Sequence, residues 1–238
     1  MRIAVCDDNK VVLDSVALSI NGYIEENKLS GTVKTFLSAE KLLEMHSSEP
    51  FDIIFLDIIM PGLSGFELAE RLDDNIPIVF VTSCDNMVYD SIQYRPFAFI
   101  RKNQYDKMND DIQKAMSKII SHLKQTKVIS IDVGYGEIAD MMVKNIVFVK
   151  SSGHYLEWYL KDNTILRCRA KFSDYEEQFK EYDFIRIHRC FYVNMRSITL
   201  FDIRNEEVTL NGCIKLDISR SLKDAVHDKY RTFLKTNS

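Results

Sequence analysis

The order of apolar segments in the first half of the chain constrains its fold more than any other feature. Short apolar runs alternate there with segments in which apolar residues recur at helical spacing. We predict strands at these runs, which are residues 3–5, 32–36, 53–56, 78–81 and 97–100. Helical patterns separate the runs, including a weaker one over residues 87–94, and a long amphipathic pattern over residues 108–123 follows the last run. This alternation predicts an α/β unit with a parallel sheet and helices on both faces.

The pattern changes near residues 125–128, where period-two alternation of apolar and polar residues begins. We predict strands at residues 146–149, 155–160, 164–168, 184–187, 198–203, 207–210 and 214–218. The dipeptide Asn211-Gly212 is a hairpin signal between the last two. Only residues 174–180 and 221–234 have a helical pattern. The second half is therefore predicted to be a mostly β module that ends in a helix.

Charge and hydropathy narrow the functional classes. The 238 residues carry a formal charge of −4, which is ordinary for a soluble protein. Residues 1–127 hold 14 basic and 19 acidic residues, whereas residues 128–238 hold 17 and 16, which indicates two units with different partners. No apolar run approaches the roughly 20 residues that span a bilayer, so we expect no membrane segment. The acids at residues 7–8 disfavour a signal peptide.

The cysteines favour a reducing compartment. They are odd in number, and no two form a C-x-x-C pair: Cys6, Cys84, Cys168, Cys190 and Cys213. This argues against a disulfide framework and against a zinc ribbon. We therefore expect reduced, mostly buried thiols in a cytoplasmic protein.

Chemically matched side chains follow the predicted strands of the first half. Asp7 and Asp8 follow the first strand, Asp57 follows the third, Thr82 ends the fourth and Lys102 follows the fifth. The carboxyl ends of parallel strands share one edge of a sheet, where such folds place their sites. Crowded carboxylates repel one another, and Mg²⁺ relieves this repulsion. The set therefore suits transfer of a phosphoryl group to a carboxylate, with the metal and the lysine neutralising charge.

Each of these residues also has a purely structural explanation. Asp8 or Asn9 is a candidate N-cap for the next helix. Thr82 could simply end a strand, and Lys102 could be a solvated surface lysine. The functional hypothesis rests on five chemically compatible residues at the ends of four of the five predicted strands.

Residues 1–124 resemble the receiver domain of bacterial two-component response regulators. Asp7-Asp8 resembles the acidic metal-binding pair of that family, and residues 57–65 match its D-x-x-M-P-G-x-x-G loop. The resemblance implies a flavodoxin-like fold with strand order 2-1-3-4-5. It implies that Asp57 is the phosphoacceptor and that Mg²⁺ is held by Asp7, Asp8, Asp57 and the backbone carbonyl of Ile59.

The resemblance also implies a switch and a partner. A sensor histidine kinase would phosphorylate Asp57, Thr82 would move toward the phosphoryl group, and the ring of Phe99 would swing inward. The changed surface would then favour a homodimer, on phosphorylation or on DNA. The family usually has proline after the lysine, whereas this chain has Asn103. We expect a trans bond there, because a non-proline cis bond costs roughly 2.5–4 kcal/mol.

Residues 131–238, after a predicted linker at 125–130, resemble the LytTR-type DNA-binding domain of AgrA-like and VirR-like regulators. Residues 184–194 match the family's F-x-R-x-H-R-S-F-x-V-N pattern, with Cys190 in the serine position. The resemblance implies an elongated β fold that lays loops into successive major grooves of double-stranded promoter DNA. The loop at His154 and Tyr155 would reach DNA. Lys171 would contact the backbone, and Arg189 and Arg220 would read bases.

Alternatives remain open for the second unit. Tyr155 could lie in the core, Arg189 could pair with an acid such as Asp183, and His188 is expected to be a packing residue. The second unit could also bind protein or RNA under the control of phosphorylation. A metal-dependent phosphatase is the weakest class, because the second catalytic aspartate it needs would stand where Ile59 does. We predict a two-domain transcription regulator that is not an enzyme.

Overall fold

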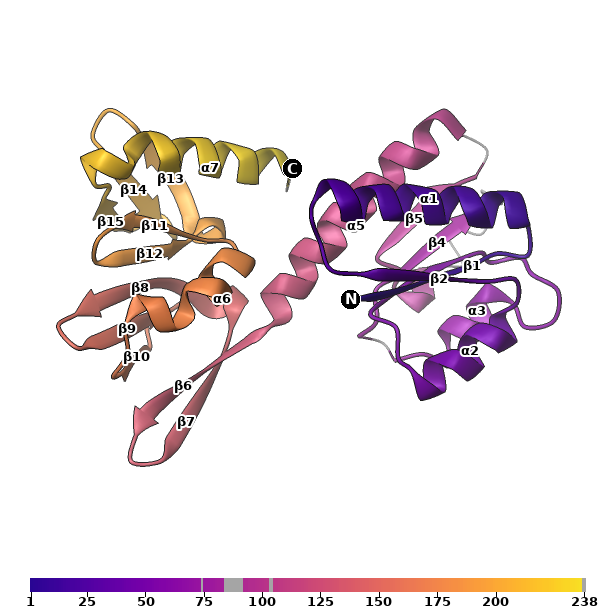
Figure 1. Ribbon diagram of the computed structural model, residues 1–238, viewed down its shortest axis with the longest axis horizontal. Coiled ribbons are helices and arrows are strands. Elements are labelled where there is room, and N and C mark those ends of the chain that lie inside the picture. Colours follow the sequence, from indigo (N-terminus) through magenta and orange to yellow (C-terminus); the bar gives the residue numbers. More distant parts are fainter. Residues whose placement is uncertain (74, 84–91, 103–104, 237–238) are drawn as a thin grey trace. The chain divides into compact units, whose positions relative to one another are not determined.

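The computed structural model describes the chain except residues 74, 84–91, 103–104 and 237–238. Its contacts divide into two compact units, Met1–Ile119 and Ile120–Ser238 (Figure 1). The division falls inside helix α5 (Tyr105–Thr126), and strand β6 begins at Val128. The predicted linker at 125–130 thus contains the end of a helix and the start of a strand. The domain bounds drawn from the sequence remain a prediction.

The first unit contains the parallel sheet that the alternating pattern predicts. Its strands run in the order β2-β1-β3-β4-β5, and every neighbouring pair is parallel. They are β1 (Arg2–Cys6), β2 (Thr32–Phe36), β3 (Ile53–Leu56), β4 (Ile78–Thr82) and β5 (Ala98–Arg101). This is the predicted flavodoxin-like order. All of β3 and β4 is buried, as expected of strands covered on both faces.

Helices cover both faces of this sheet (Figure 1). They are α1 (Lys10–Glu26), α2 (Ala39–Ser48), α3 (Gly65–Ala69) and α5, with the 3₁₀ turn η1 (Ile92–Tyr94) before β5. The side chain of Gln113 on α5 donates a hydrogen bond to the carbonyl oxygen of Ser19 on α1. Leu42 of α2 and Leu68 of α3 share an apolar cluster with Ile54 and Phe80 of the sheet. The helices pack on the two faces of the sheet, and the candidate site lies at the carboxyl ends of its strands.

The second unit is mostly β. A five-stranded antiparallel sheet has the order β10-β9-β8-β12-β11, and a three-stranded sheet has the order β13-β14-β15. The first comprises β8 (Ile146–Ser152), β9 (Tyr155–Leu160), β10 (Ile165–Cys168), β11 (Phe184–His188) and β12 (Phe191–Asn194). The second comprises β13 (Ile198–Asp202), β14 (Glu207–Leu210) and β15 (Ile214–Asp217). Asn211-Gly212 lies in the β14–β15 hairpin loop, as predicted.

Two apolar clusters hold this unit together. One surrounds Trp158, which is fully buried with Phe179 of α6 (Glu176–Glu181). The other packs Phe148, Ile187 and Val208 between the two larger sheets, with Val226 of α7 (Lys223–Thr236). The described residues of this unit also form the 3₁₀ turns η2 (Val143–Asn145), η3 (Phe172–Tyr175), η4 (Met195–Ser197) and η5 (Arg220–Leu222).

The strand pattern missed three strands of the second unit. They are β6 (Val128–Gly134) and β7 (Glu137–Met142), which form a separate two-stranded hairpin, and β12. The predicted helix at 174–180 is divided between η3 and α6. The β6–β7 turn places Tyr135 and Gly136 at φ +58° and +80°, the combination that type I′ turns require. Tyrosine is a rare residue at such a position, so the residue types do not indicate this turn.

Candidate functional site

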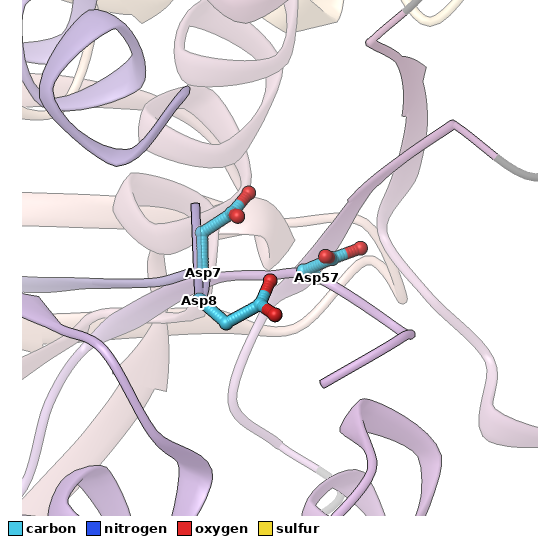
Figure 2. Close-up of side chains that lie close together, drawn as sticks. All are labelled: Asp7, Asp8 and Asp57. Atoms are coloured by element: carbon cyan, nitrogen blue, oxygen red, sulfur yellow. The ribbon is translucent and has the colours of Figure 1, made fainter. Parts of the chain in front are cut away.

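The ends of β1 and β3 gather three carboxylates. Asp7 and Asp8 follow β1 and Asp57 follows β3, and these two strands are paired neighbours. One ligand oxygen from each carboxylate lies within 4.8 Å of the other two, and Figure 2 shows the resulting cluster. Asp7 is 2% and Asp57 is 4% exposed, whereas Asp8 is exposed. Carboxylates this close repel one another unless positive charge lies beside them.

Lys102 supplies part of that positive charge. Its Nζ lies 2.6 Å from Asp7 Oδ2 and 2.6 Å from Asp57 Oδ2, and the residue is 8% exposed. The surface-lysine alternative is therefore wrong for this residue. Burial raises the pKa of Asp7, and the hydrogen bond from Lys102 opposes that rise. Three carboxylates and one ammonium group leave the cluster net negative.

The N-cap of α1 is Asn9. Its side-chain oxygen accepts hydrogen bonds from the backbone N–H groups of Val11 at 3.0 Å and Val12 at 3.4 Å. Its own backbone N–H donates to Asp7 Oδ1 at 2.9 Å. Capping therefore does not account for the carboxylate of Asp8.

The donor set fits a hard divalent cation. Asp57 Oδ1 is buried and has no hydrogen-bond partner among the residues that the structure describes. Buried polar atoms are nearly always satisfied, so this oxygen points to a ligand that lies between it and the neighbouring carboxylates. Mg²⁺ combines few carboxylates with water and phosphate oxygens, which matches the site. Ile59, whose carbonyl is a further predicted ligand, has a 51% exposed side chain and lies two residues after Asp57.

The turn from β3 into α3 is tight because residue 65 is glycine. A Cβ on Gly65 would lie 2.1 Å from the carbonyl oxygen of Asp57, which is closer than atoms can approach. The N–H of Gly65 donates to the carbonyl oxygen of Ile58 at 2.9 Å. Ser64 and Glu67 form a capping box, in which each side chain accepts the backbone N–H of the other. These contacts hold the backbone that carries Asp57.

Helix α2 holds the same loop through Glu40, which sequence reasoning missed. Glu40 Oε1 accepts the N–H of Leu63 at 2.8 Å. Hydrogen bonds from its own backbone N–H and from Leu63 lower the pKa of Glu40. Gly62 has φ +80°, and a Cβ there would lie 2.5 Å from Glu40 Oε1. An acid in the first turn of a helix is already explained by the helix dipole, so no sequence pattern indicates this longer-range contact.

The predicted switch residues lie on β4 and β5. Thr82 is the last residue of β4 and is 1% exposed, and its carbonyl accepts the N–H of Lys102 at 3.0 Å. Phe99 is half-buried, pairs with Phe80 across the strands and packs against the cluster beneath α2 and α3. Most of the predicted helix at 87–94, together with Cys84 and the bond between Lys102 and Asn103, lies outside the described residues.

In the second unit, the loops predicted to reach DNA lie at one end of the five-stranded sheet. Antiparallel pairing brings the β8–β9 turn, the end of β10 and the β11–β12 turn to that end. The N–H of Ser151 donates to the carbonyl of Cys190 at 2.9 Å, and the N–H of Ser219 donates to the carbonyl of Ile187 at 2.8 Å. The first bond connects the end of β8 to the β11–β12 turn, and the second connects β11 to the segment that precedes Arg220.

The predicted DNA-contacting residues are all exposed. His154 and Tyr155 lie at the β8–β9 turn, Lys171 follows β10, Arg189 lies in the β11–β12 turn and Arg220 begins η5. The ring of Tyr155 is not in the core, since the residue is 37% exposed.

Acidic side chains near the predicted DNA-contacting residues either pair with them weakly or pair with other cations. Arg220 Nε lies 3.4 Å from Glu206, but its side chain is 91% exposed, so this ion pair is weak. Asp183, the acid considered for Arg189, pairs with Lys124 at 2.9 Å and with Arg196 at 3.4 Å.

Arg167 belongs to the same end of the sheet, although sequence reasoning gave it no separate role. Its guanidinium carbon lies 3.9 Å from the centroid of the Tyr155 ring, which is a cation–π contact. Its alternation with two further basic residues, at 169 and 171, was the available signal. The Arg167 guanidinium therefore places a positive charge beside Tyr155, which is predicted to contact DNA.

Comparison with known proteins agrees with both halves of this description. Residues 3–117 match the model of the response regulator receiver domain, and residues 136–231 match that of the LytTr DNA-binding domain. The chain is 27% identical over 218 residues to the sensory transduction protein LytT of Bacillus subtilis, covering 83% of this chain and 84% of that protein. It is 25% identical over 171 residues to LytT of Oceanobacillus iheyensis, covering 68% and 69%. It is 24% identical over 247 residues to the transcriptional regulatory protein BtsR of Salmonella typhi, covering 95% and 99%.

The parallel sheet with its acidic edge defines a receiver domain, and it is followed by a LytTR domain. The chain belongs to the response regulators that combine these two domains. Among the described residues, no helix has both the length and the hydropathy needed to cross a bilayer.

Proposed function

We propose that a sensor histidine kinase phosphorylates Asp57 and that the chain then binds promoter DNA to control transcription. The environment of Asp57 carries this proposal. The carboxylate is buried, one of its oxygens is paired with Lys102 at 2.6 Å, and the other has no partner among the described residues. Asp7 and Asp8 stand beside it. Such a site presents a nucleophilic oxygen, a fixed cation and ligands for a metal at one point.

The chemistry follows from these positions. An oxygen of Asp57 forms a bond to phosphorus while the bond between phosphorus and the kinase histidine breaks, and the imidazole nitrogen keeps that electron pair. Lys102 then donates hydrogen bonds to the phosphoryl oxygens. When bound by Asp7, Asp8, Asp57 and the carbonyl of Ile59, Mg²⁺ supplies further positive charge against the transferring group.

We propose that the signal leaves the site through β4 and β5. The hydroxyl of Thr82 donates a hydrogen bond to the new phosphoryl group, which draws the end of β4 toward Asp57. The ring of Phe99, now half-buried, turns inward, and the changed surface forms a homodimer. Dimerisation places two LytTR domains on repeated DNA sites.

The DNA interface would be the loop surface of the second unit. Arginine can donate two hydrogen bonds to guanine, so Arg189 and Arg220 are the proposed base readers. His154 and Tyr155 would enter the groove beside them, and Lys171 would contact phosphates. The two backbone bonds that join these loops support a single interface.

The test compares wild type with Asp57→Asn and with Asp14→Asn, which removes an exposed acid on α1 as a matched control. Each chain is treated with Mg²⁺ and beryllofluoride, and its association state and the sequences it selects from random DNA are measured. We expect dimerisation and tighter, salt-dependent selection for wild type and Asp14→Asn alone. Capture of RNA or of protein without selection of DNA would overturn the DNA proposal. Turnover of a phosphomonoester would favour the phosphatase class instead.

A further inference from the structure

The turn between β11 and β12 lacks the residue types that normally form a two-residue hairpin turn. Only Arg189 and Cys190 separate the strands, because His188 pairs with Phe191. Turns of this length are usually type I′ or II′ and need positive φ, which glycine or asparagine supplies. Neither Arg189 nor Cys190 has positive φ, whereas Gly153 in the β8–β9 turn has φ +63°. The β11–β12 turn therefore depends on support from side chains.

A β-bulge precedes this turn and joins it to a second DNA-facing loop. Arg186 pairs with Tyr192 and His188 with Phe191, so Ile187 is an extra residue in β11. Bulges turn a strand and redirect its side chains. The carbonyl of Ile187 accepts the N–H of Ser219, the residue before Arg220. The loop that carries Arg189 and the loop that carries Arg220 are therefore both attached to this bulge.

The side chain of Arg186 spans the turn. Its Nη2 donates to the carbonyl oxygen of Arg189 at 3.2 Å, and its Nε lies 3.4 Å from the carbonyl oxygen of His188. The guanidinium carbon also lies 5.8 Å from the centroids of the Phe172 and Tyr192 rings, which are two cation–π contacts. One planar group therefore holds two consecutive carbonyls.

Both backbone polar groups of Cys190 are also bonded. His188 Nδ1 accepts the N–H of Cys190 at 3.2 Å, and the carbonyl of Cys190 accepts the N–H of Ser151 at 2.9 Å. Each of these bonds comes from a side chain or from a neighbouring strand, so the turn is held by groups other than the backbone of its own two residues.

We infer that Arg186 is a positioning residue for DNA recognition, which acts by holding the β11–β12 turn so that Arg189 presents its side chain to a base. This inference rests on the proposed DNA-binding function. Arg186 acts through Arg189 and makes no essential contact with DNA itself. Lysine cannot replace it, because an ammonium group lacks the planar fork that bridges two carbonyls.

The experiment measures the affinity of the phosphorylated full-length chain for the DNA sequence that wild type selects, over a range of salt concentrations. The variants are Arg186→Gln, Arg186→Lys, Arg189→Ala and the double variant Arg186→Gln/Arg189→Ala. Lys161→Gln is the control for loss of one positive charge, because Lys161 lies beyond the far end of β9. Folding is checked by the fluorescence of Trp158, the single tryptophan.

We expect Arg186→Gln and Arg186→Lys each to weaken binding at least tenfold, with an unchanged salt slope, while Lys161→Gln changes affinity less than threefold. The double variant should bind no more weakly than Arg189→Ala, because the positioning acts only through Arg189. Hydrogen exchange at the Cys190 amide should increase in the Arg186 variants.

Three results would overturn the inference. Full affinity in Arg186→Lys with a salt slope lower by about one in Arg186→Gln would make Arg186 a phosphate contact. Additive losses of affinity in the double variant would show that Arg186 does not act through Arg189. Wild-type affinity in a folded Arg186→Gln chain would leave it no role in recognition. Failure of wild type to select any DNA would instead overturn the proposed function on which the inference rests.

Discussion

Replacement of Gly65 by alanine tests the geometry around Asp57 most directly. The new Cβ would lie 2.1 Å from the carbonyl oxygen of Asp57, 2.9 Å from its carbonyl carbon and 2.9 Å from the Cα of Ile58. Contacts of a Cβ under 3.0 Å essentially never occur, so the turn must open by about 0.9 Å. All three neighbouring atoms are backbone atoms, so rotation of a side chain cannot relieve the overlap.

Opening the turn should lower both the free energy of unfolding of the receiver and the rate at which Asp57 is phosphorylated. Overpacking costs roughly 1–3 kcal/mol, and replacement of a helical glycine by alanine recovers at most about 1 kcal/mol. We expect Gly65→Ala to lower the free energy of unfolding of the receiver by about 1–2 kcal/mol. A displacement near 1 Å can slow a positioned reaction by about 100-fold, so the phosphorylation rate of Asp57 should fall roughly 10- to 100-fold.

Gly22→Ala is the matched control. Gly22 lies inside α1, and a Cβ there would meet no atom within 4 Å. The same substitution should therefore raise the free energy of unfolding by about 0.5–1 kcal/mol and leave phosphorylation unchanged.

Both variants are compared with wild type by urea unfolding followed through hydrogen exchange in β1 and β3, and by phosphate incorporation from a small acyl phosphate. Wild-type stability and rate in Gly65→Ala would refute the close approach of this glycine to Asp57. Reduced stability with a normal rate would refute only the claim that the turn positions the carboxylate.

Three further predictions concern stability and reactivity. Ser64→Ala removes the N-cap of α3 and should lower the free energy of unfolding by about 0.5–2 kcal/mol in urea; an unchanged midpoint would mean that the capping box adds nothing. Phe179→Ala empties the centre of the cluster around Trp158 and should cost about 3–5 kcal/mol, read from tryptophan fluorescence; a loss below 1 kcal/mol would contradict its central place. Burial, and then the charges of Asp7 and Asp57, raise the pKa of Cys6 to about 12. A maleimide at pH 8 should therefore modify exposed Cys213 long before Cys6 in peptide mass spectra, and equal rates would disprove the protection.

The fold of the first unit could be predicted because each signal was local. A strand buried on both faces is a continuous apolar run, and β3 and β4 are such runs. The β6–β7 hairpin is different, because β6 buries only alternate residues and β7 buries little beyond Met141. Strand β12 follows its partner after a turn with no glycine, asparagine or aspartate, so no residue type marked where β11 ended.

The candidate site likewise contains residues that could be predicted from the sequence and a contact that could not. Asp7, Asp8, Asp57 and Lys102 could be grouped because parallel strands bring their ends together whatever the loops do. The contact of Glu40 with Leu63 joins residues 23 positions apart, and it depends on how α2 packs beside the loop. No pattern within either segment shows such a contact, and only the packed structure reveals it.

The charge at the acidic edge provides a route by which the proposed phosphorylation of Asp57 would affect Thr82, the proposed switch residue. Lys102 Nζ is shared between Asp7 and Asp57, so a phosphoryl group on Asp57 competes for a cation that is already in place. The backbone of Lys102 is bonded to the carbonyl of Thr82 at 3.0 Å, and residue 101 is paired with Thr82 across β4 and β5. A change of partner by the ammonium group would therefore act on the same two strand ends that the Thr82 hydroxyl would move. Lys102→Met, which keeps the length of the stem but removes the charge, should thus permit Mg²⁺ binding yet uncouple phosphorylation from dimerisation. Dimerisation of a phosphorylated Lys102→Met chain at the wild-type level would refute this coupling.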